Sequence, residues 1–337
     1  MDKKTEKSIE QFYKNNNINP NQYAASEAEA YETGKEFNLQ IAEEYLNAKV
    51  DKWLERFEDE DRQYFLQLLE NYIYISEKEY RHRVYILSSY IINQTKKLGI
   101  ASEEILFISV ASCQGTASGG DSLRNALIIG NMEWGIVKQQ IISDVSKLPY
   151  DILEKSKALV FIDDIIGTGF SIRQTIDNFF AHFPNTNKQQ YIWGIAGIMV
   201  QKSAVRYLEK NIKKYNVEFH VFVEENNFIK NCFKGNYIFD EKEVKEVEKI
   251  IEDYEREIGI DKDSGKSYVM GFRACKLLLS FYYNTPNNTL CSFWKFTDKN
   301  VPVFPRDKYI RPTVKYLQEN KLHYQKNAYL KGCEDKK

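Results

Sequence analysis

The chain has 337 residues, 43% of them hydrophobic, and a formal net charge of −1 at neutral pH. This length predicts about two domains, and the hydrophobic content is ample for a buried core. Because 47 basic and 48 acidic residues nearly balance and form no long block of like charge, direct nucleic-acid binding is disfavoured. The five cysteines are widely spaced without a C-x-x-C pair, which predicts reduced thiols in a cytoplasmic protein.

No segment of the sequence is predicted to cross a membrane. The longest clearly apolar stretch, residues 192–200, is too short to span a bilayer. The amino-terminal residues are polar and charged, and they show no signal peptide. We therefore expect a soluble cytoplasmic protein without a membrane partner.

Residues 1–100 are predicted to form a polar amino terminus followed by a helical cap. Residues 1–35 are rich in Asn and Lys at first, and we expect them to be loosely ordered. From Leu39 to Leu98 apolar residues recur at helical spacing, and Asp59 and Asp61 are suitable helix-start residues. This helical segment would serve as a cap or as an oligomerisation surface.

Residues 101–235 predict an α/β core with a mainly parallel sheet. Apolar stretches rich in β-branched residues alternate with helical or irregular segments, as they do where helices join parallel strands. Strands are predicted at residues 105–110, 158–162, 191–200 and 217–223. Sheets of this kind bind ligands at the carboxyl ends of their strands, so side chains at those ends are the first candidates for a site.

Residues 236–337 predict a helical and irregular carboxyl-terminal region. Apolar residues from Val244 to Ile258 lie on one face of a highly charged helix. The Gly-Lys-Ser triplet at 265–267 lacks the earlier glycine and the preceding strand of a P-loop, so we interpret it as a connecting loop. Four later polar residues either contact a ligand or shape turns: Asn284, Asn287, Asn288 and Arg306.

The most informative stretch follows the second predicted strand. Asp163 and Asp164 come directly after the apolar run 159–162, and a short loop with two glycines leads from them into a helix. The loop residues are Ile165, Ile166, Gly167, Thr168, Gly169, Phe170 and Ser171. The first amides of a helix point outward at the positive end of its dipole, and glycines let a phosphate approach them. Carboxylates beside such a loop can accept hydrogen bonds from sugar hydroxyls, so the pattern predicts a sugar-phosphate site.

This order of residues resembles the thirteen-residue signature of type I phosphoribosyltransferases. From Leu159 to Ser171 it reads four apolar residues, two acids, two apolar residues, a small residue, Thr, Gly, any residue and Ser. The resemblance implies that Asp163 and Asp164 are catalytic-site residues that hold the ribose hydroxyls of phosphoribosyl diphosphate. It assigns residues 165–171 to the loop around the 5-phosphate and implies Mg²⁺ as cofactor, bound mainly through the diphosphate of the substrate.

Two other interpretations of this stretch fit it less well. In a Rossmann dinucleotide site the glycines precede the acid, whereas here the acids come first. The other alternative is an ordinary strand–helix turn capped by Ser171.

Purine-using members of the resembled family often carry an acid where this chain has Gly167, so the acceptor stays open. A nucleotide sensor that has lost catalysis is the main alternative to an enzyme.

The loop after the first predicted strand is a second candidate. In the resembled family, a loop in this kind of position binds diphosphate through backbone amides, and small residues permit that approach. The candidate residues here are Ser112, Gly115, Ser118 and Gly119, with Arg124 available to neutralise charge. The alternative is a flexible connection that leads into a helix.

The carboxyl-terminal motifs give a wider resemblance, to phosphoribosyltransferase-like proteins of bacterial conflict (anti-phage) systems, some of them linked to retrons. Its elements are residues 284–289, Phe293-Trp294 and residues 304–306, with Trp53 and Phe57 before the sheet. It implies a pentosyltransferase-type enzyme that modifies or depletes a nucleotide, and a homo-oligomer or a defence-system partner protein. An interaction protein with a vestigial site is a third alternative.

Overall fold

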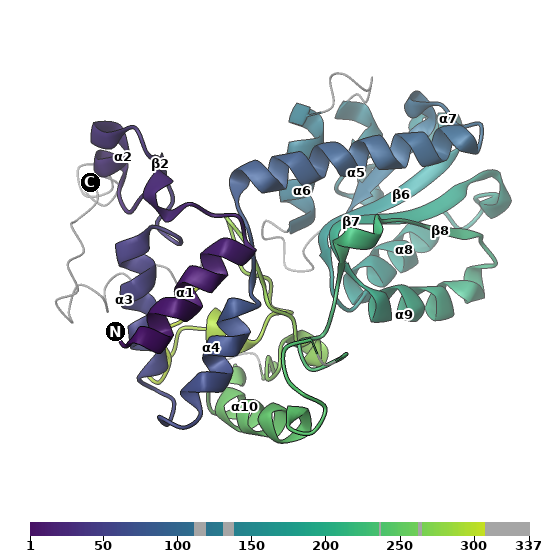
Figure 1. Ribbon diagram of the computed structural model, residues 1–337. Coiled ribbons are helices and arrows are strands. Elements are labelled where there is room, and N and C mark those ends of the chain that lie inside the picture. Colours follow the sequence, from purple (N-terminus) through teal and green to yellow (C-terminus); the bar gives the residue numbers. More distant parts are fainter. Residues whose placement is uncertain (111–118, 131–137, 236, 262–264, 307–337) are drawn as a thin grey trace, which may run out of the picture. The chain divides into compact units, whose positions relative to one another are not determined.

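The computed structural model describes residues 1–110, 119–130, 138–235, 237–261 and 265–306 (Figure 1). These residues form two compact units, which are described separately below. The sheet unit is Lys78–Lys230, and the flanking unit combines Met1–Glu77 with the described residues from Asn231 onward. None of the helices in these ranges has the length and hydropathy needed to span a bilayer.

The sheet unit is built on parallel strands in the order β5–β4–β6–β7–β8, with β9 beside the end of β7. The strands are β4 (Ile105–Ser109), β5 (Ile141–Ile142), β6 (Ala158–Ile166), β7 (Ile192–Gln201), β8 (Phe219–Phe222) and β9 (Phe228–Ile229). Each of these described pairs is parallel. The predicted fold class, α/β with a mainly parallel sheet, is confirmed, and a strand lies in each of the four predicted stretches.

Helices cover both faces of this sheet (Figure 1), with α5 and α6 on one face and α8 and α9 on the other. The helices are α5 (Glu77–Lys97), α6 (Gly119–Gly130), α7 (Tyr150–Lys155), α8 (Phe170–His182) and α9 (Lys202–Ile212). Alternate strand residues point to the same face, and Phe161 and Trp193 accordingly pack with Phe179 of α8. Both faces are buried, which explains why the strands read as nearly continuous apolar runs.

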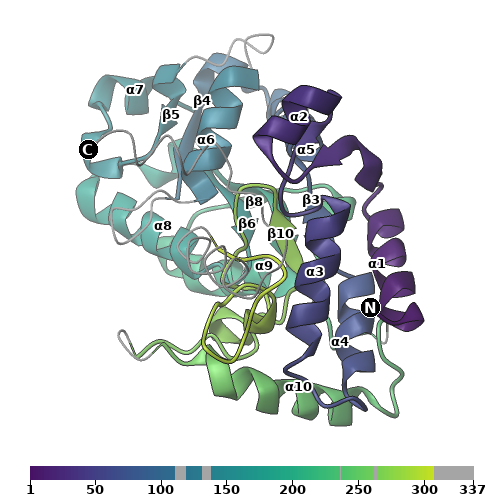
Figure 2. The same ribbon diagram turned by 90° about the vertical axis from the view of Figure 1, so that its left-hand side faces the viewer.

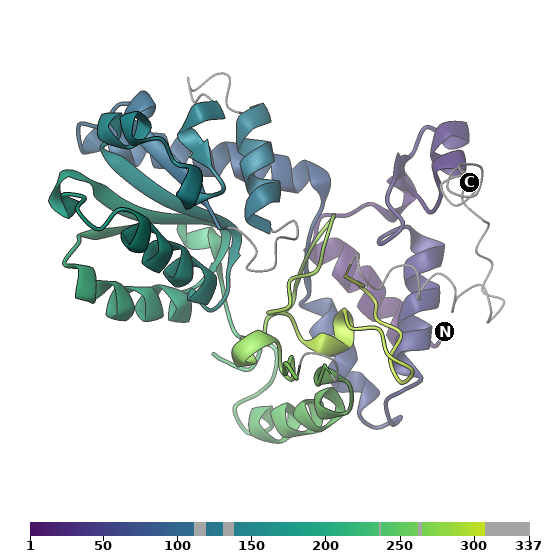
Figure 3. The same cartoon turned by 180° about the vertical axis from the view of Figure 1, so that it is seen from behind.

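The flanking unit is mainly helical. Its elements are α1 (Lys3–Asn15), α2 (Glu27–Thr33), α3 (Glu43–Leu54), α4 (Arg62–Glu70), α10 (Val244–Gly259), β1 (Tyr23–Ala24), β2 (Glu36–Phe37), β3 (Ile73–Ile75) and β10 (Leu279–Phe281). α1 lies beside α3 and α4 (Figure 2). The end of the described chain, yellow in Figure 3, lies against α3, where Trp53 Nε1 donates to Ser292 O at 3.0 Å.

Short 3₁₀ helices join these elements. They are η1 (Pro20–Gln22), η2 (Ser102–Glu104), η4 (Lys138–Gln140), η5 (Val145–Lys147), η6 (Lys188–Gln190), η7 (Lys213–Tyr215), η8 (Glu225–Asn227), η9 (Phe272–Ala274) and η10 (Cys291–Phe293). The described cysteines, Cys232, Cys275 and Cys291, are buried, and none of them is in a disulfide bond.

The prediction of a loosely ordered amino terminus is wrong. Residues 3–15 form α1, which buries Ile9, Phe12 and Tyr13 in the core of the flanking unit. The Asp2 side chain begins this helix by accepting hydrogen bonds from the amides of Lys4 and Thr5, each at 2.8 Å. The high polar content concealed a helix with one apolar face, whose burial against other helices supplies most of its stability.

The two units do not follow the three segments 1–100, 101–235 and 236–337. The segments on either side of the sheet share one core, because β3 pairs in parallel with β10 and because α3 and α4 bury residues together with α10. α5 instead belongs to the sheet unit: Arg83 Nη1 lies 3.4 Å from Met199 Sδ on β7 and donates to Asn227 Oδ1 at 3.2 Å.

Asp61 directly precedes α4, as expected of a helix-start residue, but its side chain does not cap the helix. Its carboxylate accepts a hydrogen bond from the Tyr254 hydroxyl at 2.9 Å, which ties α4 to α10. Asp59 forms an ion pair with Arg62 at 2.7 Å. The helical segment predicted from Leu39 to Leu98 is interrupted at Ile73, which begins β3, and helix resumes with α5.

Candidate functional site

The signature stretch occupies the end of β6 and the start of α8. β6 continues to Ile166 because it stays paired with β7, from Asp163 opposite Gly197 to Ile166 opposite Val200. Its pairing with β4 ends at Ile162. The two aspartates therefore lie inside the strand rather than after it, in a part that extends past the last paired residue of β4.

The carboxylates of this stretch are oriented by the backbone. Asp163 Oδ1 accepts a hydrogen bond from the Asp164 amide at 3.0 Å, and Asp164 Oδ1 accepts one from the Ile165 amide at 2.7 Å. Asp164 is only 6% exposed, and Asp163 is partly buried. An ionised carboxylate can accept about four hydrogen bonds, so this orientation by an amide is compatible with binding the hydroxyls of a sugar.

Gly169 shapes the loop between β6 and α8. It is the N-cap residue of the helix and adopts the left-handed conformation, with φ of 73°. A Cβ atom at this position would lie 2.9 Å from Leu208 Cγ and 3.0 Å from Ala204 O, both in α9. Glycine offers no side-chain cap, so the amides that follow Phe170 in the first turn of α8 can bind an anion in the way that helix starts commonly bind phosphate.

The hydroxyl residues of the loop flank this helix start. Thr168 Oγ1 accepts a hydrogen bond from the Phe170 amide at 3.2 Å, which holds Thr168 over the first turn. Ser171 is exposed, one residue into the helix. The stretch predicted from Ile165 to Ser171 thus forms one continuous strand end, loop and helix start, with hydroxyl donors on it.

The second predicted loop can be located only in part. Ser112, Gly115 and Ser118 lie outside the described residues, and Gly119 begins α6. A Cβ atom on the next residue, Gly120, would lie 2.4 Å from Val110 O. Glycine therefore permits the start of α6 to pack directly against the end of β4.

Arg124 of α6 is the basic residue nearest in sequence to this second helix start. Its side chain is partly buried, and its Nε atom is buried without a hydrogen-bond partner in the described structure. α6 packs along β6, the strand that carries both aspartates. Leaving a buried donor unsatisfied costs about 1–3 kcal/mol, a cost that a ligand oxygen would relieve.

The two helix starts meet the same edge of the sheet. β4 and β6 are neighbours and run parallel, so their carboxyl ends lie side by side, about 4.8 Å apart. One edge therefore brings together the Asp163–Asp164 pair, the start of α8 and the start of α6, the helix that carries Arg124. The described residues contain no group of three or more His, Cys, Asp or Glu side chains that could hold a metal ion.

Sequence reasoning missed Arg83 and Asn227, which lie at the carboxyl end of β7. Arg83 Nε donates a hydrogen bond to Glu79 Oε1 at 2.6 Å, and Arg83 Nη1 donates one to Oδ1 of the buried Asn227 at 3.2 Å. The same Nη1 atom contacts Met199 of β7, the residue that pairs with Ile165 of the signature stretch. The helical pattern around Arg83 indicates only a surface position, because its meeting with β7 depends on tertiary packing. We regard it as the residue that fixes α5 to this end of the sheet.

The polar residues of the carboxyl-terminal motifs make contacts within the flanking unit. The carbonyls of Asn284 and Asn287 accept hydrogen bonds from the amides of Phe281 and Phe272 at 2.9 and 2.7 Å. Asn288 Nδ2 donates to Cys275 Sγ at 3.3 Å, and Arg306 Nη1 donates to Thr285 O at 2.6 Å.

The 265–267 triplet follows α10 and forms part of a connecting loop, where Ser267 pairs with Ile260.

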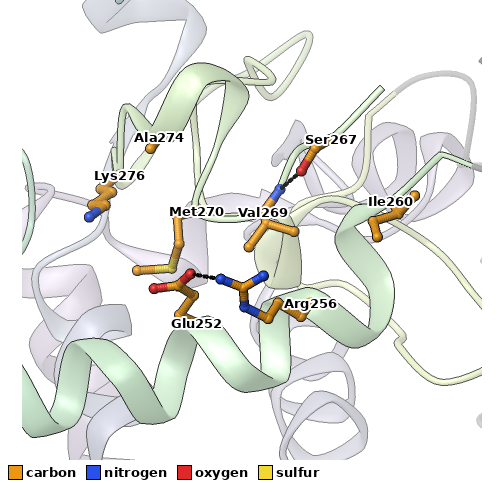
Figure 4. Close-up of a pocket in the computed structure, with 8 residues that line it drawn as sticks. All are labelled: Glu252, Arg256, Ile260, Ser267, Val269, Met270, Ala274 and Lys276. Atoms are coloured by element: carbon orange, nitrogen blue, oxygen red, sulfur yellow. Dashed lines mark hydrogen bonds and ion pairs between the residues drawn. The ribbon is translucent and has the colours of Figure 1, made fainter. Parts of the chain in front are cut away.

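A pocket of about 500 Å³ lies in the flanking unit (Figure 4). Its lining residues are Glu252, Arg256, Ile260, Ser267, Val269, Met270, Ala274 and Lys276. Arg256 is paired with Glu252, and Lys276 is paired with Glu248, so neither cation faces the pocket unbalanced. None of these residues belongs to the signature stretch.

A family model described as PRTase-CE matches residues 50–306. The chain belongs to this phosphoribosyltransferase-like family. The PRTase-CE match includes β6, the loop before α8 and the carboxyl-terminal motifs, so it confirms the family resemblance drawn from residues 159–171. Membership in PRTase-CE indicates a phosphoribosyltransferase-type function with a phosphoribosyl or nucleotide substrate. No curated protein and no solved structure gives a significant match.

Proposed function

We propose that the chain binds phosphoribosyl diphosphate, or a related ribose phosphate, and acts as a glycosyltransferase of the phosphoribosyltransferase type. The observation that supports this proposal is the presence of two helix starts at one sheet edge, each of which could bind an anion. One is the loop before α8 beside Asp163 and Asp164, and the other is the start of α6 with Arg124. Phosphoribosyl diphosphate carries a phosphate and a diphosphate at the two ends of a ribose, so its groups match these elements.

The chemistry of such a reaction requires positioning more than a nucleophile. Breaking the bond between ribose C1 and the diphosphate develops positive charge on the ring and negative charge on the leaving group. Asp163 and Asp164 would orient the ribose close to the positive charge, while Thr168, Gly169 and Ser171 anchor the 5-phosphate. Fixed amides and a guanidinium aimed at the leaving group act by positioning and electrostatics.

Mg²⁺ is the metal ion proposed for this site. It usually keeps several waters and binds through one or two carboxylates together with the phosphates of a substrate. Asp163 and Asp164 offer oxygen ligands of this type, and the described residues offer no larger acidic cluster. The ion would therefore be held mainly through the diphosphate, where it would neutralise charge on the leaving group.

Replacing Arg124 with methionine should weaken binding of phosphoribosyl diphosphate about 10- to 100-fold, the effect of losing one charge-assisted hydrogen bond of roughly 1.5–3 kcal/mol. Binding of ribose 5-phosphate, which lacks the diphosphate, should change little. The substitution removes no hydrogen bond at the buried Nε, which has no partner in the described structure. Calorimetric titration with both ligands measures the difference.

Arg206→Met is the matched control, because Arg206 is an exposed arginine on α9. An equal loss of affinity for both ligands in Arg124→Met would contradict a role at the diphosphate.

Mg²⁺-dependent release of diphosphate separates an enzyme from a sensor: turnover supports the transferase, and binding without turnover supports a regulatory module. Gly167, which stands where purine-using enzymes often have an acid, is the feature that favours the sensor.

The acceptor in this proposal is a base or a nucleotide, or water in a degradative reaction. The resemblance of residues 284–289 and 304–306 supports an extension, to a nucleotide-modifying or nucleotide-depleting effector in anti-phage defence. Such an effector would act as a homo-oligomer or with a partner protein. Nucleotide pools in phage-infected cells test this role, and pools that are the same with wild type and with the Asp163→Asn, Asp164→Asn variant would contradict it.

A further inference from the structure

Lys49 of α3 lies in the core of the flanking unit. Its side chain is 0% exposed, and its Nζ atom donates a hydrogen bond to Val303 O. Nζ lies 4.8 Å from the centre of the Tyr45 ring and 5.7 Å from the centre of the Phe304 ring. This one amine therefore connects α3 to residues 300–306, the end of the described chain.

The surroundings of Lys49 favour a neutral amine. A carbonyl and two rings favour the cation, but full burial opposes it, and no described carboxylate offsets that burial. Burial lowers the pKa of Lys49 to about 7. An ordinary lysine has a pKa near 10.4, so this amine would lose its proton within the physiological range.

Three buried tyrosines of the same core do not compete with Lys49 near neutral pH. Burial raises the pKa of Tyr13 on α1 and of Tyr72 and Tyr74 on either side of Ile73, so these phenols stay neutral there. The two cations on the same segments have partners of their own: Lys52 pairs with Glu55, and Arg306 donates to Thr285 O.

We propose that Lys49 is a proton-sensitive latch, whose neutral amine holds residues 300–306 against α3 and whose protonation favours their release. The released state lets the charged amine reach water, so it binds the proton more tightly than the closed state does. By linkage, closure gains stability as pH rises above the titration point of the closed state, and this gain is absent below that point. Thr285 Oγ1 donates to Phe304 O at 2.7 Å, so release would also loosen the turn at 284–289.

Hydrogen exchange of the amides in residues 300–306, corrected for the intrinsic pH dependence of exchange, tests the latch in the full chain. In wild type, protection should rise about tenfold between pH 6 and pH 8, since one proton is linked to opening. In Lys49→Met, which keeps the length of the side chain and removes the amine, protection should not change over this range. Lys52→Met, at a partly buried position of the same helix, is the control and should behave as wild type.

Equal pH dependence in wild type and Lys49→Met would overturn the proposal. A second measurement on wild type alone does not depend on the variant folding. The ¹³Cε resonance of Lys49, followed by NMR as pH is varied, should titrate near pH 7. Titration above pH 9 would show that the buried amine stays charged, and it would equally overturn the latch.

Discussion

Replacing Gly169 with alanine is expected to destabilise the sheet unit and to abolish binding of a 5-phosphate. The left-handed conformation at φ of 73° costs a residue with a Cβ atom about 1–2 kcal/mol. The new methyl group would also meet Leu208 Cγ at 2.9 Å and Ala204 O at 3.0 Å, and such overpacking adds roughly 1–3 kcal/mol. Relief of this clash must move the start of α8 away from α9, and the phosphate loop with it. Urea unfolding and ribose 5-phosphate titration measure both effects.

Gly99→Ala separates the two costs. Gly99 lies in the same unit with a similar φ of 76°, but nothing lies within 4 Å of the Cβ atom that alanine would add. This control should show the conformational cost alone and should bind ligand normally. If Gly169→Ala were no more destabilising than Gly99→Ala and kept its ligand affinity, the contact with α9 would not shape the phosphate loop.

Replacing Glu255 with alanine is expected to destabilise the flanking unit by about 3–9 kcal/mol. Glu255 is fully buried in α10, and its carboxylate accepts hydrogen bonds from the amides of Met270, Cys291 and Ser292 at 3.1, 2.8 and 2.7 Å. Its removal leaves three buried N–H groups without this partner, and each such group costs about 1–3 kcal/mol. Chemical denaturation followed by tryptophan fluorescence reports the loss, because Trp53 and Trp294 are buried in this unit.

Glu257→Ala is the control for this experiment. Glu257 lies on the same helix, but it is partly exposed and its ion pair with Lys299 is long, at 3.5 Å. Exposed pairs of this kind contribute little to stability, so the control should unfold almost as wild type does. Similar denaturation midpoints for Glu255→Ala and Glu257→Ala would show that the carboxylate does not anchor the chain around residues 270 and 291.

The part of the site that the sequence predicted is the part encoded locally. Asp163 to Ser171 form a strand end, a glycine loop and a helix start, each of which depends on neighbours along the chain. Their order alone allowed the family to be inferred before any tertiary contact was known. Even here the exact end of β6 depended on its pairing with β7, which a single stretch of sequence does not contain.

The features that escaped prediction depend on contacts between distant segments. The sequence does not show that Gly120 packs on Val110 or that Arg83 reaches the end of β7, since both contacts require the finished fold. The sequence did not show that the two ends of the chain form one flanking unit, because this depends on the pairing of β3 with β10, which lies about 200 residues further along the chain. α1 was overlooked because polar residues outnumber the few apolar ones that form its buried face.

The central claim is that the Asp163–Asp164 pair and the loop before α8 hold a phosphoribosyl group. Calorimetric titration with phosphoribosyl diphosphate and Mg²⁺ tests it most directly, on wild type and on the Asp163→Asn, Asp164→Asn double variant, with circular dichroism to confirm folding. The account predicts saturable binding by wild type that the double variant loses. A well-folded wild type that binds no phosphoribosyl diphosphate, or a double variant that binds it equally well, would contradict the account.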